Sequence, residues 1–407
     1  MQELKRIINY KRIILLLIAV TVNVVFFLYD NKLVMDEDII NKENVAHETY
    51  IKNYHEEVNA IIDNADKLKK YSIFNKAGSF SYANILQTAR DFERVKNVIL
   101  PEDEYKGVQA YTTYYYQYFF TMLVMMFVIY DMFAQRDNGM WSITYSCANG
   151  RIMYAIKQTG VIVVTGAFTH TLIYWSTFIA AMLQRGGVRD LVNPVQTIET
   201  FDKFTYPWSK IKYVTVLYLI SMVCIVALCI TIWGVFVMFR NRVYALVTML
   251  IFAAVEQFIY SHIDIHSVWN GLHYINIINI ININATFSSY RNWGVGTYVF
   301  PVFSVVLFVH IICAGIIGYI AINVSASMKP YKNTTFIKRF TDCVSAGCQK
   351  ILARIPFLFK EIHKFIFTSH CGWVVVVMLT VTAYVCQTGQ YHYTDDNNCL
   401  LYTSPSP

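Results

Sequence analysis

Charged residues are scarce in this sequence. Of its 407 residues, only 15% are Asp, Glu, Lys or Arg, whereas 56% are hydrophobic. Soluble domains hold roughly 25% charged and 45–50% apolar residues. The apolar residues here fall in runs of about 20, the length of helix that crosses the hydrocarbon of a bilayer. The composition therefore excludes an ordinary soluble domain and predicts an integral membrane protein.

Several chemical signatures are also missing. The sequence contains no G-x-x-x-x-G-K-[ST] phosphate loop, which excludes a Walker-type ATP site. Its nine cysteines are scattered and include no C-x-x-C pair, so we infer neither disulfides nor a zinc site. The net charge of +7 fits cytoplasmic loops facing anionic lipid better than nucleic-acid binding. We expect no cofactor or metal in this chain.

Seven apolar segments are predicted to cross the membrane, which makes the expected fold class all-α: a polytopic six-helix bundle plus a seventh span. No small-residue cleavage site follows the first segment, so we interpret it as an uncleaved anchor rather than a signal peptide. The predicted spans are residues 12–29, 113–134, 158–183, 213–239, 244–262, 297–323 and 372–387.

Basic residues set the expected orientation. They gather in the N-terminal tail and in a linker over 324–371, and the positive-inside rule places both in the cytoplasm. Segment 30–112 then lies outside. Its apolar residues recur at helical spacing between 36 and 100, which predicts a helical extracellular insertion. Loop 184–212 opposes this pattern, because it is basic and is predicted outside.

Three shorter segments have patterns of their own. Residues 3–12 alternate basic and apolar side chains, as an amphipathic helix at the inner surface does. Residues 135–157 form a short inner loop that mixes glycine with Trp and Ile. Residues 263–296 are rich in Asn and Ile, and we expect short helices that re-enter the membrane, since irregular backbone there must be satisfied by protein or water.

The C-terminal part repeats the order of the N-terminal part. A basic stretch, an apolar span and acidic residues follow one another in both, so 372–398 is expected to begin a second membrane unit. Residues 399–407 read CLLYTSPSP, which resembles translated sequencing adapter. We interpret this end as the non-native tail of a truncated sequence. A natural polar tail is the alternative.

The order of these parts resembles the type 2 ABC exporter permeases over about residues 1–325. That family has an inner-face helix, six spans, a coupling helix between spans two and three, and re-entrant helices between spans five and six. Asp137 stands where the family often has Glu, and residues 147–149 replace its usual Ser/Thr-Pro stretch. The local match is Arg136-Asp137-Asn138-Gly139-Met140, then Asn149-Gly150-Arg151, then Lys157.

The resemblance implies a permease subunit that is not itself an enzyme and sits in a bacterial cytoplasmic membrane as a multi-pass protein with a cytoplasmic N terminus. ATP and Mg would bind to a separate ABC ATPase docked under 135–157 and under residues 3–12. A second membrane half, covalent or a dimer partner, would complete the exporter. The coupling residues that it implies are Arg136, Asp137, Gly139, Trp141, Ile143, Arg151 and Lys157.

Polar residues inside the apolar spans are candidate sites. Glu256 and Gln257 lie within a predicted span, where a carboxylate is costly and is by default a functional hypothesis. They belong either to a substrate path or to a structural hydrogen bond between helices. His170 and His310 are interpreted as satisfied core residues. The tyrosine-rich run 111–118 is interpreted as an aromatic belt at the membrane interface.

Two readings compete with a permease. A membrane-anchored sensor or receptor would use segment 36–100 to bind its ligand, although no cytoplasmic output domain is evident. An intramembrane enzyme would need a paired acid or a metal set such as H-E-x-x-H within a span, and none occurs. The motif His262-x-Asp264-x-His266 is either a zinc pair or, as we favour, the polar end of a span.

Overall fold

The computed structural model describes residues 10–32, 37–71, 78–101, 106–137, 150–239, 241–263, 269–295 and 297–327. The chain divides into two compact units, Met1–Met328 and Lys329–Pro407, and every described residue belongs to the first. Several predicted elements lie outside the described residues: the linker 324–371 beyond residue 327, the span 372–387, the second unit 372–398, the tail 399–407, and residues 3–9 of the inner-face helix.

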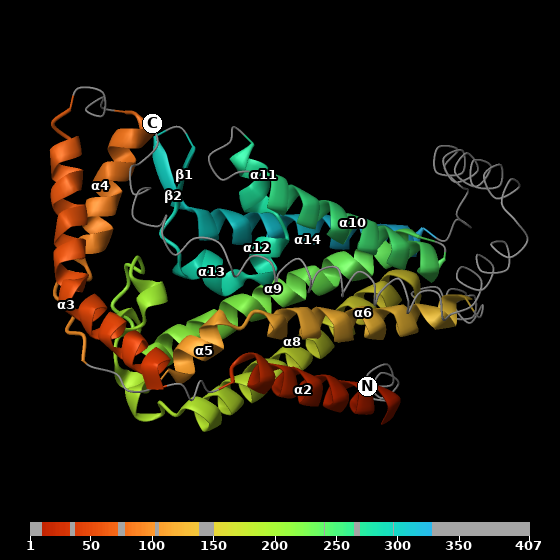
Figure 1. The fold of residues 1–407 in the computed structure, drawn as a ribbon. Helices are drawn as coiled ribbons and strands as arrows, with labels where there is room; N and C mark the ends of the chain where they lie inside the picture. Colours follow the sequence, from red (N-terminus) through yellow and green to blue (C-terminus); the bar gives the residue numbers. More distant parts are fainter. Residues whose placement is uncertain are drawn as a thin grey trace, which may run out of the picture. The chain divides into compact units, whose positions relative to one another are not determined.

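Six of the described helices are long and apolar enough to cross a bilayer. They run side by side in Figure 1 and match the first six predicted spans, as expected of a multi-pass, mostly helical membrane protein. These helices are α2 (Tyr10–Asp30), α6 (Tyr116–Asp137), α8 (Gly150–Arg185), α9 (Lys210–Met238), α10 (Arg242–His262) and α14 (Val302–Ala326).

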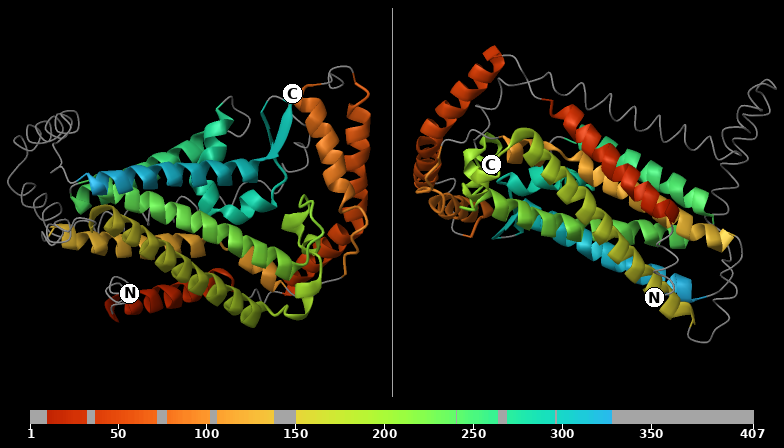
Figure 2. Two further views of the ribbon diagram at one scale, coloured as in Figure 1. Left: turned by 180° about the vertical axis from the view of Figure 1, so that it is seen from behind. Right: turned by 90° about the horizontal axis from the view of Figure 1, so that it is seen from below.

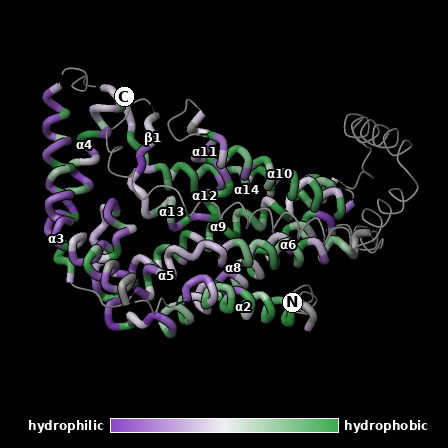
Figure 3. The backbone as a smooth tube through the Cα atoms, in the orientation of Figure 1, coloured by the Kyte–Doolittle hydropathy of each residue, from purple (hydrophilic) through white to green (hydrophobic). Residues whose placement is uncertain are grey.

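Helix α9 is the central member of this bundle. It contacts α6, α8, α10 and α14, and the two views of Figure 2 show it between them. In the most apolar 18-residue stretch of α9, 61% of the residues are buried, compared with 11% in the corresponding stretches of α2 and α10. Apolar side chains such as Leu17 and Phe258 therefore stay exposed on the outer helices, where lipid would cover them. Figure 3 shows the long helices as largely hydrophobic.

Helices α9 and α14 approach each other closely through small residues. Gly234 of α9 faces Ile317 and Ala321 of α14, and a Cβ atom at Gly234 would overlap the Ile317 Cγ2 methyl. Ala314 and Ala321 are both buried. In membranes, helix association depends on such close packing, because lipid removes the hydrophobic driving force between helices. The contact between α9 and α14 therefore depends on small residues, which let a branched side chain of the other helix pack close to the backbone.

A polar helical pair stands apart from the spans. Helix α3 (Glu37–Leu68) and helix α4 (Phe80–Glu93) pack together at one end of the bundle and appear largely hydrophilic in Figure 3. The Ser79 hydroxyl caps α4 by accepting a hydrogen bond from the backbone N–H of Tyr82. The pair holds its own small core, made of Tyr54, Val58, Phe92 and Val95.

Short elements join the helical pair to the bundle. Helix α5 (Gly107–Thr113) packs on α8. Helix α8 ends at Gly186 and Gly187, whose φ angles of 70° and 103° reverse the chain in a conformation that glycine favours. The loop that follows contains η1 (Arg189–Val192), η2 (Val195–Thr197) and η3 (Glu199–Phe201). The Tyr50 hydroxyl of α3 donates to the Gln196 carbonyl at 2.8 Å, which ties α3 to this loop.

The structure corrects the predicted element boundaries. An antiparallel β-hairpin, β1 (Asn292–Val295) with β2 (Tyr298–Pro301), adds a small sheet to the predicted all-α class. Span six begins only after it, at Val302, because residues 298–301 are strand. Span three is longer than predicted, since α8 already begins at Gly150 within the segment interpreted as an inner loop.

Candidate functional site

Three short helices fill the segment between α10 and α14. They are α11 (Asn270–Ile275), α12 (Ile278–Ile281) and α13 (Ile283–Ser288). Helices α11 and α12 contact both α10 and α14, and α13 contacts α14. The asparagines of this segment bind backbone groups. Asn276 Oδ1 accepts from Ile278 N at 2.8 Å, and Asn279 Nδ2 donates to the His273 carbonyl at 2.7 Å. Irregular backbone beside apolar spans is thereby satisfied by protein, as membrane burial requires.

The carboxylate of Glu256 binds this segment directly. Its Oε2 accepts a hydrogen bond from Ile277 N at 3.0 Å, and its carbonyl accepts one from Asn276 Nδ2 at 2.7 Å. The structure therefore gives Glu256 a role in holding α11 to α13 against α10. Neighbouring Gln257 has its Oε1 buried without a hydrogen-bond partner.

We expect Glu256→Leu to loosen the short helices while Glu256→Gln leaves them in place. Leucine cannot accept the Ile277 hydrogen bond, and an unsatisfied backbone N–H costs about 1–3 kcal/mol. Glutamine keeps an acceptor oxygen at the same position. Hydrogen–deuterium exchange over residues 270–290 measures the difference, which should reach roughly tenfold for leucine. Equal exchange in the two variants would contradict this role for the carboxylate.

Four of the seven predicted coupling residues lie at two helix ends. Arg136 and Asp137 end α6, and Arg151 and Lys157 lie in the first turns of α8. Gly139, Trp141 and Ile143 lie outside the described residues. The structure thus joins Arg151 and Lys157 in one continuous helix with span three, rather than in a separate loop.

The first turns of α8 carry an exposed apolar face. Ile152, Met153 and Ile156 are each about half exposed, at 54%, 51% and 48%. They lie between the exposed basic residues Arg151 and Lys157. Nearby, the guanidinium of Arg12 on α2 pairs with the carboxylate of Asp131 on α6. This end of the bundle therefore combines apolar side chains with flanking positive charge.

His170 and three tyrosines of the run 111–118 lie in the interior of the bundle. His170 is buried, and its Nε2 lies 2.8 Å from the Ser221 hydroxyl, as expected of a satisfied core residue. The aromatic-belt interpretation is wrong for Tyr111, Tyr114 and Tyr118, which are all buried. Tyr114 donates to the Asn23 side chain at 3.0 Å, so its polar tip is satisfied inside the protein rather than at the membrane surface.

His262 is exposed at the end of α10, while Asp264 and His266 lie outside the described residues. Among the residues that are described, no group of three or more His, Cys, Asp or Glu side chains is placed to hold a metal ion. The His310 Nδ1 lies 2.8 Å from the Val306 carbonyl one turn earlier, a local hydrogen bond.

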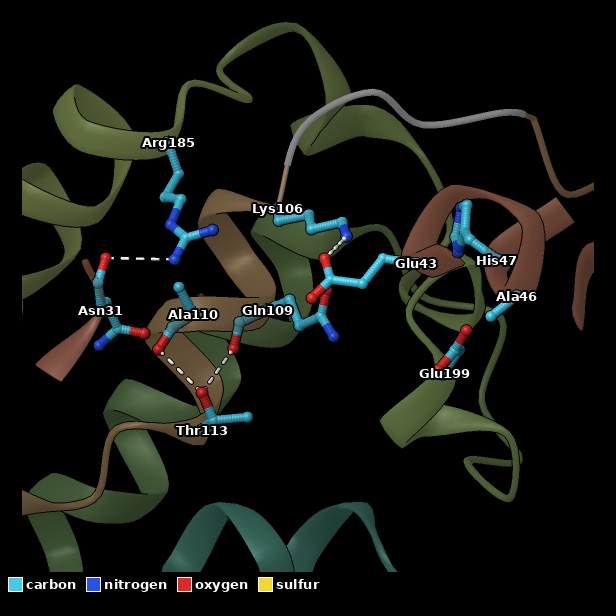
Figure 4. A pocket seen from close by; sticks show the side chains of 10 residues that line it. All are labelled: Asn31, Glu43, Ala46, His47, Lys106, Gln109, Ala110, Thr113, Arg185 and Glu199. Atoms are coloured by element: carbon cyan, nitrogen blue, oxygen red, sulfur yellow. Dashed lines mark hydrogen bonds and ion pairs between the residues drawn. The ribbon is translucent and has the colours of Figure 1, made fainter. Parts of the chain in front are cut away.

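A polar cavity of about 340 Å³ opens where α3 meets the bundle. Figure 4 shows Arg185 and Asn31 on one side of it and Glu43, His47 and Glu199 on the other. The lining residues come from α3, α5, α8, η3 and the residue after α2: Asn31, Glu43, Ala46, His47, Lys106, Gln109, Ala110, Thr113, Arg185 and Glu199. Sequence analysis did not identify this site, because its residues share no motif and are up to 168 positions apart (199 − 31).

Lys106 and Arg185 hold this cavity in shape. Lys106 Nζ pairs with Glu43 Oε2 at 2.5 Å and thereby links the residue before α5 to α3. Arg185 Nη2 donates to the carbonyls of Asn31 and Lys32 at 3.1 and 3.2 Å. Cations stabilise the C-terminal end of a helix, where carbonyl groups lack intrahelical partners. Arg185 therefore fastens the end of α2 to the end of α8.

Comparison with known proteins adds no relative to this picture: no protein-family model, no curated protein and no solved structure matches the chain.

Proposed function

We propose that this chain is the permease subunit of an ATP-driven ABC transporter, acting as an exporter with a separate ATPase. The observation that carries the proposal is the segment between the fifth and sixth spans. Helices α11 to α13 contact α14 and are held to α10 by Glu256. Short helices between these two spans are what the resemblance to the type 2 exporter permeases implies. The six-span order supports the same assignment.

The inner end of α8 supplies the docking surface in this proposal. Ile152, Met153 and Ile156 present apolar area, and Arg151 and Lys157 flank it with positive charge. A few apolar anchors commonly contribute most of the binding energy of such an interface, each about 2 kcal/mol or more when truncated. A partner ATPase would press on α8 here, and the bundle would switch as rigid bodies that move about an interface.

The test is the double variant Ile152→Ser/Met153→Ser in the tagged protein purified from its native membrane. We expect the co-purifying, vanadate-sensitive ATPase activity to fall by about tenfold or more, since two interface anchors are removed. The matched control is Ile179→Ser/Leu183→Ser, two exposed positions toward the other end of the same helix. ATPase activity that is lost equally in both variants, or in neither, would refute the docking surface.

A membrane receptor is the second candidate function. One observation favours it: the polar cavity lies at the foot of α3, within the segment that a receptor would use. Under this reading the cavity binds the signal, and no ATPase associates with the chain. The purification described above separates the two, because a receptor would retain no ATPase activity in the unaltered protein.

A further inference from the structure

The cavity at the foot of α3 carries opposite charges on its opposite sides. The guanidinium of Arg185 lies on one side, and the carboxylate of Glu199 lies on the other (Figure 4). Lys106 and Glu43 neutralise each other across a 2.5 Å ion pair. The remaining charges are thus one positive and one negative, on opposite sides of the Lys106–Glu43 pair in Figure 4.

Polar atoms in this cavity lack partners. Arg185 Nε and His47 Nε2 are buried from solvent and have no hydrogen-bond partner in the described structure. The carboxylate of Glu199 forms no ion pair or side-chain hydrogen bond with any described residue, although Glu199 is exposed. Buried polar groups are normally satisfied, and each exception calls for an occupant such as ordered water or a ligand. All three residues line the cavity, so their side chains border the space that a ligand would fill.

We propose that this cavity binds a small soluble zwitterion of the amino-acid or dipeptide class. The ligand's carboxylate pairs with the guanidinium of Arg185, and its ammonium group donates to the carboxylate of Glu199. A simple anion would leave Glu199 unpaired, and a simple cation would meet Arg185, so a ligand of single charge fits worse on electrostatic grounds. The volume of about 340 Å³ is at the lower end of the range for ligand pockets.

Small apolar surfaces leave room for the ligand's side chains. Ala110 lines the cavity on the Arg185 side and Ala46 on the Glu199 side, and Gln109 and Thr113 add neutral polar groups. This lining offers little shape that would select one side chain. Recognition therefore rests on the two charged ends of the ligand, as expected of a site that accepts a class of zwitterions. The inference is independent of the proposed ATPase partner, since no cavity residue belongs to the docking surface.

The test is calorimetric binding of L-alanyl-L-alanine to the purified full chain in phosphatidylcholine nanodiscs. We expect saturable binding, and binding at least about tenfold weaker for the N-acetylated and for the C-amidated dipeptide, because each loses one charged contact. Glu199→Gln should weaken the dipeptide by about tenfold and leave the N-acetylated probe unchanged. Glu199 is exposed and its side chain is unpartnered, so this variant should fold normally.

Further variants and lipids complete the test. Arg185→Lys keeps a positive charge near the end of α2 but changes the carboxylate contact, so it should weaken the dipeptide and the N-acetylated probe by a similar factor and leave the C-amidated probe nearly unchanged. Glu56→Gln, an exposed position on α3 away from the cavity, is the matched control and should bind like the parent. No saturation by ~10 mM dipeptide would overturn the proposal, as would unchanged affinity in Glu199→Gln.

Two other occupants are distinguished by the same measurements. Phosphatidylethanolamine carries a phosphate and an ammonium group, so its headgroup shares the zwitterionic chemistry. Dipeptide binding that disappears when this lipid is added to the nanodiscs would assign the cavity to the headgroup and overturn a soluble ligand. Binding of inorganic phosphate with no binding of dipeptide would identify a plain anion site and would likewise overturn the proposal.

Discussion

Gly234→Leu is expected to lower the melting temperature of the purified protein by at least about 5 °C, the result of a loss of roughly 3 kcal/mol. Gly234 lies where α9 meets α14, and even a Cβ atom there overlaps the Ile317 methyl. Leucine adds four carbons at the same point, so the two most apolar spans must separate. Because α9 also contacts α6 and α8, its separation from α14 should disturb those contacts as well.

The matched control for this variant lies on α14 itself. A Cβ at Gly315 would meet nothing within 4 Å. Gly315→Leu should therefore melt within about 1 °C of the parent, or slightly above it, because leucine has the better helix propensity. If Gly234→Leu does not accumulate in the membrane, Gly234→Ala provides a smaller version of the same overlap. Equal melting of the Gly234 and Gly315 variants would show that α9 and α14 do not depend on close approach.

Tyr290→Ala is expected to detach the helical pair α3/α4 from the bundle without unfolding the spans. Tyr290 lies between α13 and β1, and its hydroxyl donates to Asp91 Oδ2 at 3.0 Å. Its ring meets the Phe92 ring edge-on at a centroid distance of 5.2 Å. Burial raises the pKa of Tyr290 to about 12, and a tyrosine hydroxyl is protonated at neutral pH even at its ordinary pKa of about 10, so it can donate here. Truncation to alanine removes both the packing and the hydrogen bonds.

Limited proteolysis measures this detachment. Loss of a largely buried aromatic ring costs about 2–3 kcal/mol, slightly less than a fully buried one, and cleavage that requires local opening should accelerate by roughly 30-fold or more. Tryptic cleavage at Arg94 and Lys96, which follow α4, provides the readout. Tyr290→Phe keeps the ring and should accelerate cleavage only about fivefold. Parent-like cleavage in Tyr290→Ala would contradict the anchoring role.

The spans were predictable because their signal is local. About 20 consecutive apolar residues cannot be placed anywhere but in a bilayer or a core, and each of the six appears where expected. The start of α8 was not predictable in the same way. Arg151 and Lys157 lower the hydropathy of its first turns, so a helix that continues beyond the apolar run was interpreted as a loop.

Other features depend on residues far apart in the chain. Tyr114 was assigned to the membrane interface because tyrosine is common there. In the structure it is buried, and its hydroxyl donates a hydrogen bond to Asn23, which lies 91 positions earlier in the chain. The β-hairpin depends on pairs such as Trp293 with Phe300, within strands of only four residues each. The cavity is the extreme case, since its four charged residues come from α3, α8, η3 and the position before α5, and no window of sequence contains them together.

Helix α8 runs from one end of the bundle to the other as one continuous helix. Its 36 residues give a length of ~54 Å, well beyond the ~30 Å of a bilayer's hydrocarbon. One end carries the exposed face at Ile152, and the other carries Arg185 in the cavity. If the proposed ATPase and the proposed ligand both favoured one position of α8, each would raise the affinity of the other by the same factor. The docking surface and the cavity would then be thermodynamically linked through a single helix.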